Sequence, residues 1–391
     1  MALTIRRVVA NVVEMEVGFS YSSGTLDRAR AIVWEVDGGD HTGLGECGFA
    51  AEKSVPGISM SFDEGSSEGL RAGLESWVRP VLGGDAVALE AQLPPMPPEL
   101  DWDLLVVREG LSIALHDLVG KAHGLPVHAL LGGARRTQVP GMPVVHVGPT
   151  EVMVRRALAW VKAGYRYLKV KFRGDLEADE DGIRGIREAV GPDVSIQVDA
   201  NDGYAEMAEA EKAIRALVPL DINLFEDMLA APIQEIAELR TRTGVRVMVD
   251  RQATWPYVHE VIRAGAADVI NHHPNNQGGL ATALQIDAAA TAAGLQTAVG
   301  SSGLFGIQDA AFQMLSCVIG LPGPCEDIGL LPYYSGPTEG EYAFDREPTV
   351  IRNPYPIEDG VIHVPDRPGL GIELDRDRLE DCTVARLEFG I

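Results

Sequence analysis

The chain has few cysteines, no long hydrophobic run and little positive charge, and each shortage excludes a class of protein. Its four cysteines are widely spaced and show no CxxC pattern, which is typical of reduced thiols rather than of a disulfide framework or a zinc site. No stretch approaches the roughly 20 apolar residues that span a bilayer, and the first residues lack a secretory-signal pattern. We therefore expect a cytoplasmic protein that does not enter a membrane.

Acidic residues greatly outnumber basic ones. Lysine and arginine together number 33 against 57 aspartates and glutamates, for a formal charge of −24. An excess of this sign repels nucleic-acid phosphates and anionic lipids, so neither is an expected partner. An anionic small-molecule substrate would need a local positive site, which a metal ion and lysines could supply.

The length and composition fit a globular protein of two units. Hydrophobic residues make up 46% of the 391 residues and charged residues 23%, as in ordinary soluble domains. A barrel of about 250 residues and a smaller companion account for this length. We expect an α+β capping domain at 1–135, with a helical stretch at Val107–Leu131, and a barrel at 136–340. Residues 341–391 break the rhythm and should pack on the N-terminal unit or on the barrel rim.

The central part of the chain repeats a strand-then-helix pattern. Short apolar runs recur roughly every 22 to 28 residues and alternate with amphipathic stretches such as Glu151–Ala163, Ala205–Leu217 and Leu280–Ala293. Eight such strands predict a closed parallel barrel. The rival is an open doubly wound sheet, which normally has fewer strands, and no GxGxxG follows any strand here. The predicted strands are Val139–Val145, Tyr167–Phe172, Ser195–Ala200, Asn223–Asp227, Val245–Asp250, Asp268–His273, Gln296–Ser301 and Pro324–Ile328.

Ionisable residues end five successive predicted strands, where a buried strand would normally avoid them. The active site of a parallel barrel lies at the carboxyl ends of its strands, so we expect these side chains to meet. Three of them are carboxylates on successive strands, and oxygen ligands of this kind favour Mg²⁺, or Mn²⁺, over zinc. The residues are Lys169 and Lys171, then Asp199, Glu226, Asp250 and His273.

The alternation of side chains along a strand places Lys169 and Lys171 on the same side. Two neighbouring ammonium groups favour the loss of one proton, which suits a lysine to act as a general base. Asn271 and His273 share a side by the same rule, while His272 should point toward the helices. Arg251 is interpreted either as a clamp for a substrate carboxylate or as a salt-bridge residue.

These residues resemble those of the enolase superfamily, in particular its mandelate racemase/muconate lactonizing branch, and the resemblance covers nearly the whole chain. Its motifs are the KxK of Lys169 and Lys171, Val-Asp-Ala-Asn at 198–201, Phe-Glu-Asp at 225–227, Gly-Gly-Leu at 278–280, and the helix-ending segment at 112–126 before Leu-Leu-Gly-Gly.

The resemblance implies an α/β fold, a modified TIM barrel (β/α)7β, under a capping domain formed by both ends of the chain. It implies Mg²⁺ on Asp199, Glu226 and Asp250, with Lys171 as base and Lys169 beside the substrate carboxylate. Cap loops near 18–24 and 47–57 would shape the specificity pocket. It also implies a homo-oligomer. We expect the substrate to be contacted by Asn201, Arg251, Asn271 and Glu326.

Two departures from the muconate-lactonizing pattern, and the lack of the mandelate-racemase dyad, keep the reaction type open. His273 stands where the muconate-lactonizing group usually has a second catalytic lysine, and Arg251 stands where it tends to have an acid. The seventh strand carries no histidine, so the mandelate-racemase dyad is missing. We expect a racemase, epimerase or cycloisomerase that forms an enediolate from a small carboxylate. The alternatives are an acid dehydratase with the same metal and base, and a metal-binding barrel without catalysis.

Overall fold

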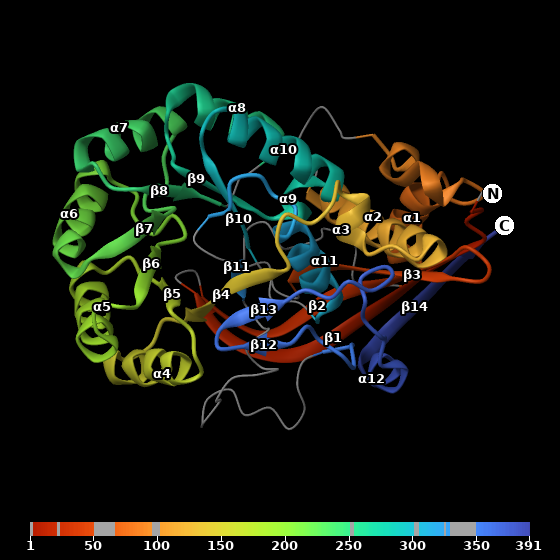
Figure 1. Cartoon of the computed structure of the whole chain (residues 1–391), viewed down its shortest axis with the longest axis horizontal. Helices are drawn as coiled ribbons and strands as arrows, with labels where there is room; N and C mark the ends of the chain where they lie inside the picture. Colours follow the sequence, from red (N-terminus) through yellow and green to blue (C-terminus); the bar gives the residue numbers. More distant parts are fainter. Residues whose placement is uncertain are drawn as a thin grey trace.

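The computed structural model of the chain combines an antiparallel sheet with a ring of alternating strands and helices (Figure 1). It describes residues 3–21, 24–50, 67–95, 102–250, 254–300, 305–323, 326–328 and 349–391. The two ends of the chain lie side by side, because the last strand pairs with the first (Figure 1).

The cap is a four-stranded antiparallel sheet with α1 and α2 on one face and α12 on the other. The sheet order is β14-β1-β2-β3, so the C-terminal strand completes the sheet. Packing of the tail on the N-terminal unit was one of the two arrangements expected. The elements are β1 Arg7–Tyr21, β2 Gly24–Asp37, β3 Thr42–Ala50, α1 Ser67–Val78, the 3₁₀ helix η1 Ala86–Gln92, α2 Trp102–His123, α3 Val127–Leu130, α12 Arg376–Cys382 and β14 Thr383–Gly390.

The helical stretch expected at Val107–Leu131 is formed by two helices, α2 and α3. Gly124 adopts φ +68, a left-handed conformation that ends the helix, and Pro126 has no N–H to continue it. The stretch expected to be helical is therefore helical except at 124–126 and at Leu131. The sheet lies close to α2, since a Cβ on Gly43 or Gly45 would lie 2.0 Å from a carbonyl oxygen of that helix.

All eight predicted barrel strands are present, and each end lies within two residues of its predicted position. Their order, β10-β9-β8-β7-β6-β5-β4, is parallel and sequential, and β11 pairs with β4 on the other side. Among the described residues no ladder joins β10 to β11, although an isolated bridge links Thr297 to Pro322. The strands are β4 Gln138–Val145, β5 Tyr167–Lys171, β6 Ser195–Asp199, β7 Ile222–Glu226, β8 Val247–Val249, β9 Val269–His272, β10 Gln296–Val299 and β11 Glu326–Ile328.

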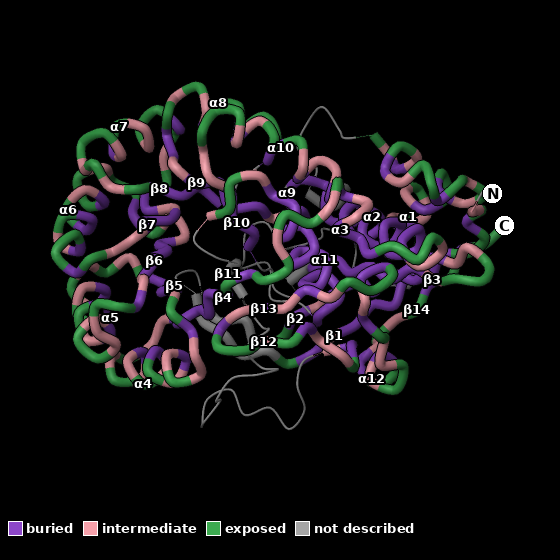
Figure 2. The backbone as a smooth tube through the Cα atoms, in the orientation of Figure 1, coloured by how far each residue is buried: buried purple, intermediate pink, exposed green. Residues whose placement is uncertain are grey.

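Helices cover the outside of these strands, with buried faces toward the sheet and exposed faces toward solvent (Figure 2). Helix α5 shows how they are bounded, since Asp175 caps its first amides and Gly191 ends it. They are α4 Thr150–Lys162, α5 Leu176–Val190, α6 Met207–Leu217 with η2 Val218–Leu220, α7 Ile233–Thr243, α8 Trp255–Ala264, α9 Pro274–Gln277, α10 Leu280–Ala292 and α11 Ile307–Ser316. A hairpin of β12 Ile357–Glu358 and β13 Val361–His363 extends the sheet next to β4.

Side chains alternate between the inside and the outside of the barrel. Val247, Val249 and Ile270 pack outward with Val258 and Val261 of α8. A separate apolar layer fills the inside, formed by Leu224, Met248, Val269 and Ala298. The residues two further along β7 and β9 also point inward, and they are polar. The apolar layer therefore lies directly beneath these polar residues.

Glu46 of β3 links the cap to the start of α11. Its carboxylate is fully buried and accepts the N–H groups of Phe305, Ile307 and Gln308 at 2.7, 2.8 and 2.9 Å. The Gln308 side chain also donates to Glu109 of α2 at 2.7 Å. A carboxylate at a helix N-terminus satisfies amides that the helix leaves unpaired. A residue of the cap domain therefore provides the N-terminal cap of this barrel helix.

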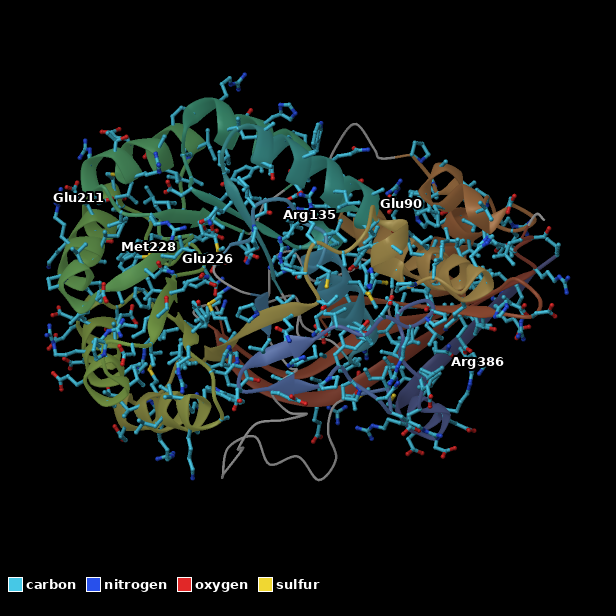
Figure 3. All side chains as sticks on the ribbon, in the orientation of Figure 1. Glu90, Arg135, Glu211, Glu226, Met228 and Arg386 are labelled. Atoms are coloured by element: carbon cyan, nitrogen blue, oxygen red, sulfur yellow. The ribbon has the colours of Figure 1, made fainter. Side chains whose placement is uncertain are left out.

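Glu90 performs the same task for α10. Its Oε1 accepts the Ala281 N–H at 2.8 Å and the Ser112 hydroxyl, while Oε2 pairs with Arg108 at 3.1 Å. Figure 3 labels Glu90 where the helices of the cap meet those of the barrel. Two consecutive barrel helices thus begin on carboxylates supplied by the cap, which sets the position of the cap relative to the strands β9 and β10 that precede those helices.

In the part of the chain that the structure describes, no helix is long and apolar enough to cross a bilayer. Among the described residues, Cys47, Cys317 and Cys382 are buried and form no disulfide.

Candidate active site at the carboxyl ends of the barrel strands

The lysine pair of β5 lies inside the barrel and contacts the carboxylates of the next two strands. Lys169 Nζ lies 3.1 Å from Asp199 Oδ2 and 3.0 Å from Glu226 Oε2. Lys171 Nζ lies 2.6 Å from Asp199 Oδ2. The two lysines therefore share one side of the strand, as predicted. Both form ion pairs with buried carboxylates, in addition to lying near each other.

Asn201 completes the contacts of Lys171. Its Oδ1 accepts a hydrogen bond from Lys171 Nζ at 3.1 Å, and its backbone N–H donates to Asp199 Oδ1 at 2.8 Å. The residue has φ +46, in the left-handed region that asparagine tolerates better than most residues. This turn holds the amide beside Asp199 and brings its oxygen to the lysine.

Glu226 is the centre of a buried polar group inside the barrel (Figure 3). It accepts hydrogen bonds from Lys169 at 3.0 Å, from Asn271 at 3.2 Å, and from the amide of Gln197. The remaining amide oxygens, Gln197 Oε1 and Asn271 Oδ1, are buried and have no hydrogen-bond partner among the described residues. This region is therefore rich in oxygen acceptors.

His273 and Asp250 form a second contact on the other side of Glu226. His273 Nε2 lies 3.0 Å from Asp250 Oδ1, and about a tenth of each side chain is exposed. His272 points the other way, as predicted, and its Nδ1 pairs with the Gln277 amide. Burial lowers the pKa of His272 to about 4, which keeps that ring neutral and supports a structural role.

Burial and neighbouring charges set the pKa of each carboxyl. Burial alone would raise the pKa of Asp199, but Lys171 and Lys169 hold it below its ordinary value. Burial, and then the charge of Asp199, raises the pKa of Glu226 well above its usual range. Burial opposes ionisation of Asp250 too, but His273 holds its pKa low. The high pKa of Glu226 thus comes first from burial and then from the charges of Asp199 and Asp250, and an added cation would favour the ionised form of this acid.

The three carboxylates fit a hard cation by donor type, and they come from three neighbouring strands. Asp199 pairs in register with Glu226, and Glu226 with Met248, so Asp250 lies two residues beyond their level. Within the described ranges, no three Asp, Glu, His or Cys side chains gather closely enough to hold a metal ion. The Lys169 ammonium lies between Asp199 and Glu226, where positive charge is needed. That these acids bind one metal ion stays a prediction.

The side chains of two residues predicted to contact the substrate are not described by the structure. Arg251 lies outside the described residues, and Glu326 is described only as backbone of β11. Of the cap loops expected to shape the pocket, 22–23 and 51–57 also lie outside the described residues.

Sequence reasoning missed two polar residues on the inner face. His146 follows β4, and since Val144 pairs in register with Lys169, His146 is at the level of Lys171 and buried. Gln197 lies on β6 two residues before Asp199 and is almost fully buried. Both residues show the sequence pattern of the predicted site residues, a polar side chain within or directly after an apolar run. His146 follows the first predicted strand, whereas the series of ionisable residues begins on the second strand.

Comparison with known proteins places these features in a family. Residues 4–132 match the profile of the "Mandelate racemase / muconate lactonizing enzyme, N-terminal domain", and residues 152–378 match "Enolase C-terminal domain-like". The N-succinyl-L-Arg/Lys racemase of Bacillus cereus is 28% identical over 288 residues, 71% of this chain and 72% of that protein. A chloromuconate cycloisomerase of a Pseudomonas species is 28% identical over 367 residues, 92% of this chain and 93% of that protein.

A solved structure shows the same fold. The muconate lactonizing enzyme from Pseudomonas fluorescens, complexed with muconolactone, superposes with a TM-score of 0.84 at 22% identity and covers 98% of this chain and 100% of that chain. The barrel and cap architecture predicted from the sequence is thereby confirmed.

Proposed function

Because the chain belongs to the mandelate racemase/muconate lactonizing family of the enolase superfamily and is an isomerase of that superfamily, we propose that Lys171 takes the α-proton of its small carboxylate substrate. His273 then works on the opposite face. The product would be an epimer, an enantiomer or a ring-opened or ring-closed isomer.

The positions of Lys171 and His273 carry this proposal. The strand order β9-β8-β7-β6-β5 puts His273 after β9 and Lys171 on β5, on either side of the three strands that end in carboxylates. Each contacts one of the outer carboxylates, Lys171 contacting Asp199 and His273 contacting Asp250. A substrate carboxylate lying over Glu226 would then present one face to each group.

The chemistry requires positive charge near the substrate carboxylate. We propose Asp199, Glu226 and Asp250 as ligands of Mg²⁺, with Mn²⁺ as a substitute, which when bound supplies charge that stabilises an enediolate dianion. Lys169, whose ammonium bridges Asp199 and Glu226, adds a second positive charge at the same place. It is suited to contact the substrate carboxylate and cannot serve equally well as base, because it lies deeper in the barrel than Lys171.

The proton transfers follow from these positions. Neutral Lys171 accepts the α-proton, so the C–H bond breaks and its electron pair enters the enediolate. His273 returns a proton to the same carbon from the other face, which inverts the centre. In a cycloisomerase the same abstraction opens a lactone ring, because the enediolate expels the ring carboxylate as the C–O bond breaks. Closure is the reverse: the carboxylate adds to form the C–O bond, and Lys171 returns the proton to the α-carbon. Asn201 holds the lysine nitrogen during these steps through its 3.1 Å hydrogen bond, and Asn271, Arg251 and Glu326 are proposed substrate contacts.

The other hypotheses have less support. A dehydratase would need His273 or Glu326 to protonate a departing hydroxyl, and no contact of the described residues favours that step over protonation of carbon. A barrel that binds metal without catalysis predicts no exchange with any acid. A homo-oligomer and a cytoplasmic location also belong to the proposal, the second supported by three buried cysteines that form no disulfide among the described residues.

Proton NMR in D₂O tests the proposed function. The enzyme and Mg²⁺ are incubated with N-succinyl amino acids, muconolactones, dipeptides and sugar acids. Deuterium entering at the α-carbon, with an isomer forming, supports the proposal. New vinyl or keto signals would indicate a dehydratase instead. No exchange across all four classes of acid would contradict proton abstraction from these substrates.

A further inference from the structure

Gly300, the residue that follows β10, lies directly against the imidazole of His273. A Cβ at position 300 would be 2.1 Å from His273 Nε2, 2.5 Å from Cε1 and 2.9 Å from Cδ2. Heavy atoms that are not bonded do not approach so closely, and ring atoms cannot bend aside like the end of a flexible side chain. The ring of His273 therefore occupies the space that any other residue at 300 would need.

The backbone holds the two residues at this distance. The Gly300 N–H donates to the carbonyl oxygen of His272 at 2.8 Å, and Val299 pairs with His272 in register. Gly300 is not among the residues with positive φ, so its conformation is open to other residues. The reason for glycine here is the space above its Cα and not the backbone torsion.

The other side of the ring is bounded as well. His273 Nε2 lies 3.0 Å from Asp250 Oδ1, so this nitrogen is placed between the ends of β8 and β10. A ring displaced by a side chain at 300 would lose this place and would move relative to Asp250.

We propose that Gly300 is a positioning residue for His273: the missing side chain lets the imidazole lie at the end of the barrel strands, across from Lys171. Gly300 itself touches no reacting atom. The effect on catalysis rests on the proposed function, whereas the effect on the position of the ring does not.

Pairing Gly300→Ala with His273→Ala isolates this effect. With an acid that exchanges in the D₂O screen, Gly300→Ala should slow protonation on the His273 face about tenfold or more. Exchange on the Lys171 face should change less than about twofold, which is the deviation expected between mutations that act independently. In the His273→Ala background, Gly300→Ala should add almost nothing. Gly148→Ala is the matched control, because its Cβ would meet no atom closer than 3.7 Å.

Two measurements without substrate or metal keep the test independent of the proposed function. In protein with ¹³C-labelled histidine, the ring signal lost in His273→Ala identifies His273, and Gly300→Ala should shift it while Gly148→Ala does not. Gly300→Ala should also lower the melting temperature more in the native background than in His273→Ala, and if it prevents folding, the double variant should fold. An unshifted His273 signal, or an equal loss in both backgrounds, would overturn the proposal. Failure of the D₂O screen with a shifted signal would overturn only the proposed function.

Discussion

Lys171 Nζ lies 2.6 Å from Asp199 Oδ2, and the two residues pair in register on neighbouring strands. The proposed base and a proposed metal ligand are therefore in direct contact. The ionised Asp199 attracts the ammonium groups of Lys171 and Lys169, and it also accepts hydrogen bonds from Asn201. A divalent cation that shares the Asp199 charge would weaken this attraction, so metal binding and the readiness of the base should be linked.

Removal of magnesium should therefore lower stability as well as abolish exchange. A ligand that binds only the folded state stabilises it by about 2.7 kcal/mol at a hundred times its Kd. Thermal unfolding with Mg²⁺ and with a chelator should differ in the native chain and not in Asp199→Asn. Asp377→Asn, at an exposed position, should keep the difference. A Mg²⁺ shift of equal size in Asp199→Asn would rule this acid out as a ligand.

Replacing His273 by alanine should separate the two faces of the substrate. Loss of a general acid or base typically costs about 10²- to 10⁴-fold in rate, so isomer formation should fall by that much. Exchange of the proton facing Lys171 should continue. Time-resolved NMR of each isomer in D₂O measures both rates, with exposed His259→Ala as control. Equal loss on both faces would show that His273 does not act on one face alone.

The junction between the cap and α10 should depend on Glu90. Alanine there leaves Arg108 buried without its ion-pair partner, and breaking a buried pair costs about 3–5 kcal/mol. Glu75→Ala removes only an exposed pair with Arg79, for which less than about 1 kcal/mol is expected. Denaturant unfolding of both variants gives the comparison. Similar small losses would mean that the hydrogen bonds of Glu90 do not hold the cap.

Glu46 should make stability fall as pH rises. Burial raises the pKa of its carboxyl from 4.5 to about 7, against the three amides that it accepts. The folded state thus holds this proton more tightly, and the contribution is complete below pH 4.5 and lost as pH passes 7. The shift corresponds to roughly 3 kcal/mol at about 1.4 kcal/mol per pKa unit. Nearby titratable groups are Glu109, Cys47 and Cys382, which interact with Glu46 electrostatically.

The comparison of the native chain with Glu46→Gln isolates this dependence. The difference in unfolding free energy between the two should move in favour of Glu46→Gln between pH 5 and pH 8. Urea titrations at these pH values measure it. Parallel stability curves for both chains over that interval would show that Glu46 does not titrate there.

The strands of the barrel were predictable because they are short apolar runs, five of which end in ionisable residues. The same pattern placed Lys169, Lys171 and His273 on the inside, since side-chain direction follows from alternation along a strand. Which partners they contact was not predictable, because Lys169 reaches Glu226 across two strand spacings. The position of Asp250, two residues beyond the level of Asp199 and Glu226, depends on the register between strands. Residue types alone do not predict that register.

Other features depend wholly on three-dimensional contacts. Gly300 reads in the sequence as an ordinary strand-end glycine, and only the position of the His273 ring explains it. Glu46 and Glu90 lie far along the chain from the helices that they cap, so local capping patterns could not reveal them.

The most direct test of the account is the rate of α-proton exchange in D₂O by Lys171→Ala, compared with the native chain and with Lys162→Ala on the outer helix α4. If Lys171 is the base, Lys171→Ala should lose exchange on the Lys171 face by about 10² to 10⁴. Lys162→Ala should be unaffected, and both variants should be folded by circular dichroism. Exchange by Lys171→Ala at the native rate would contradict Lys171 as the base, and with it the proposed mechanism.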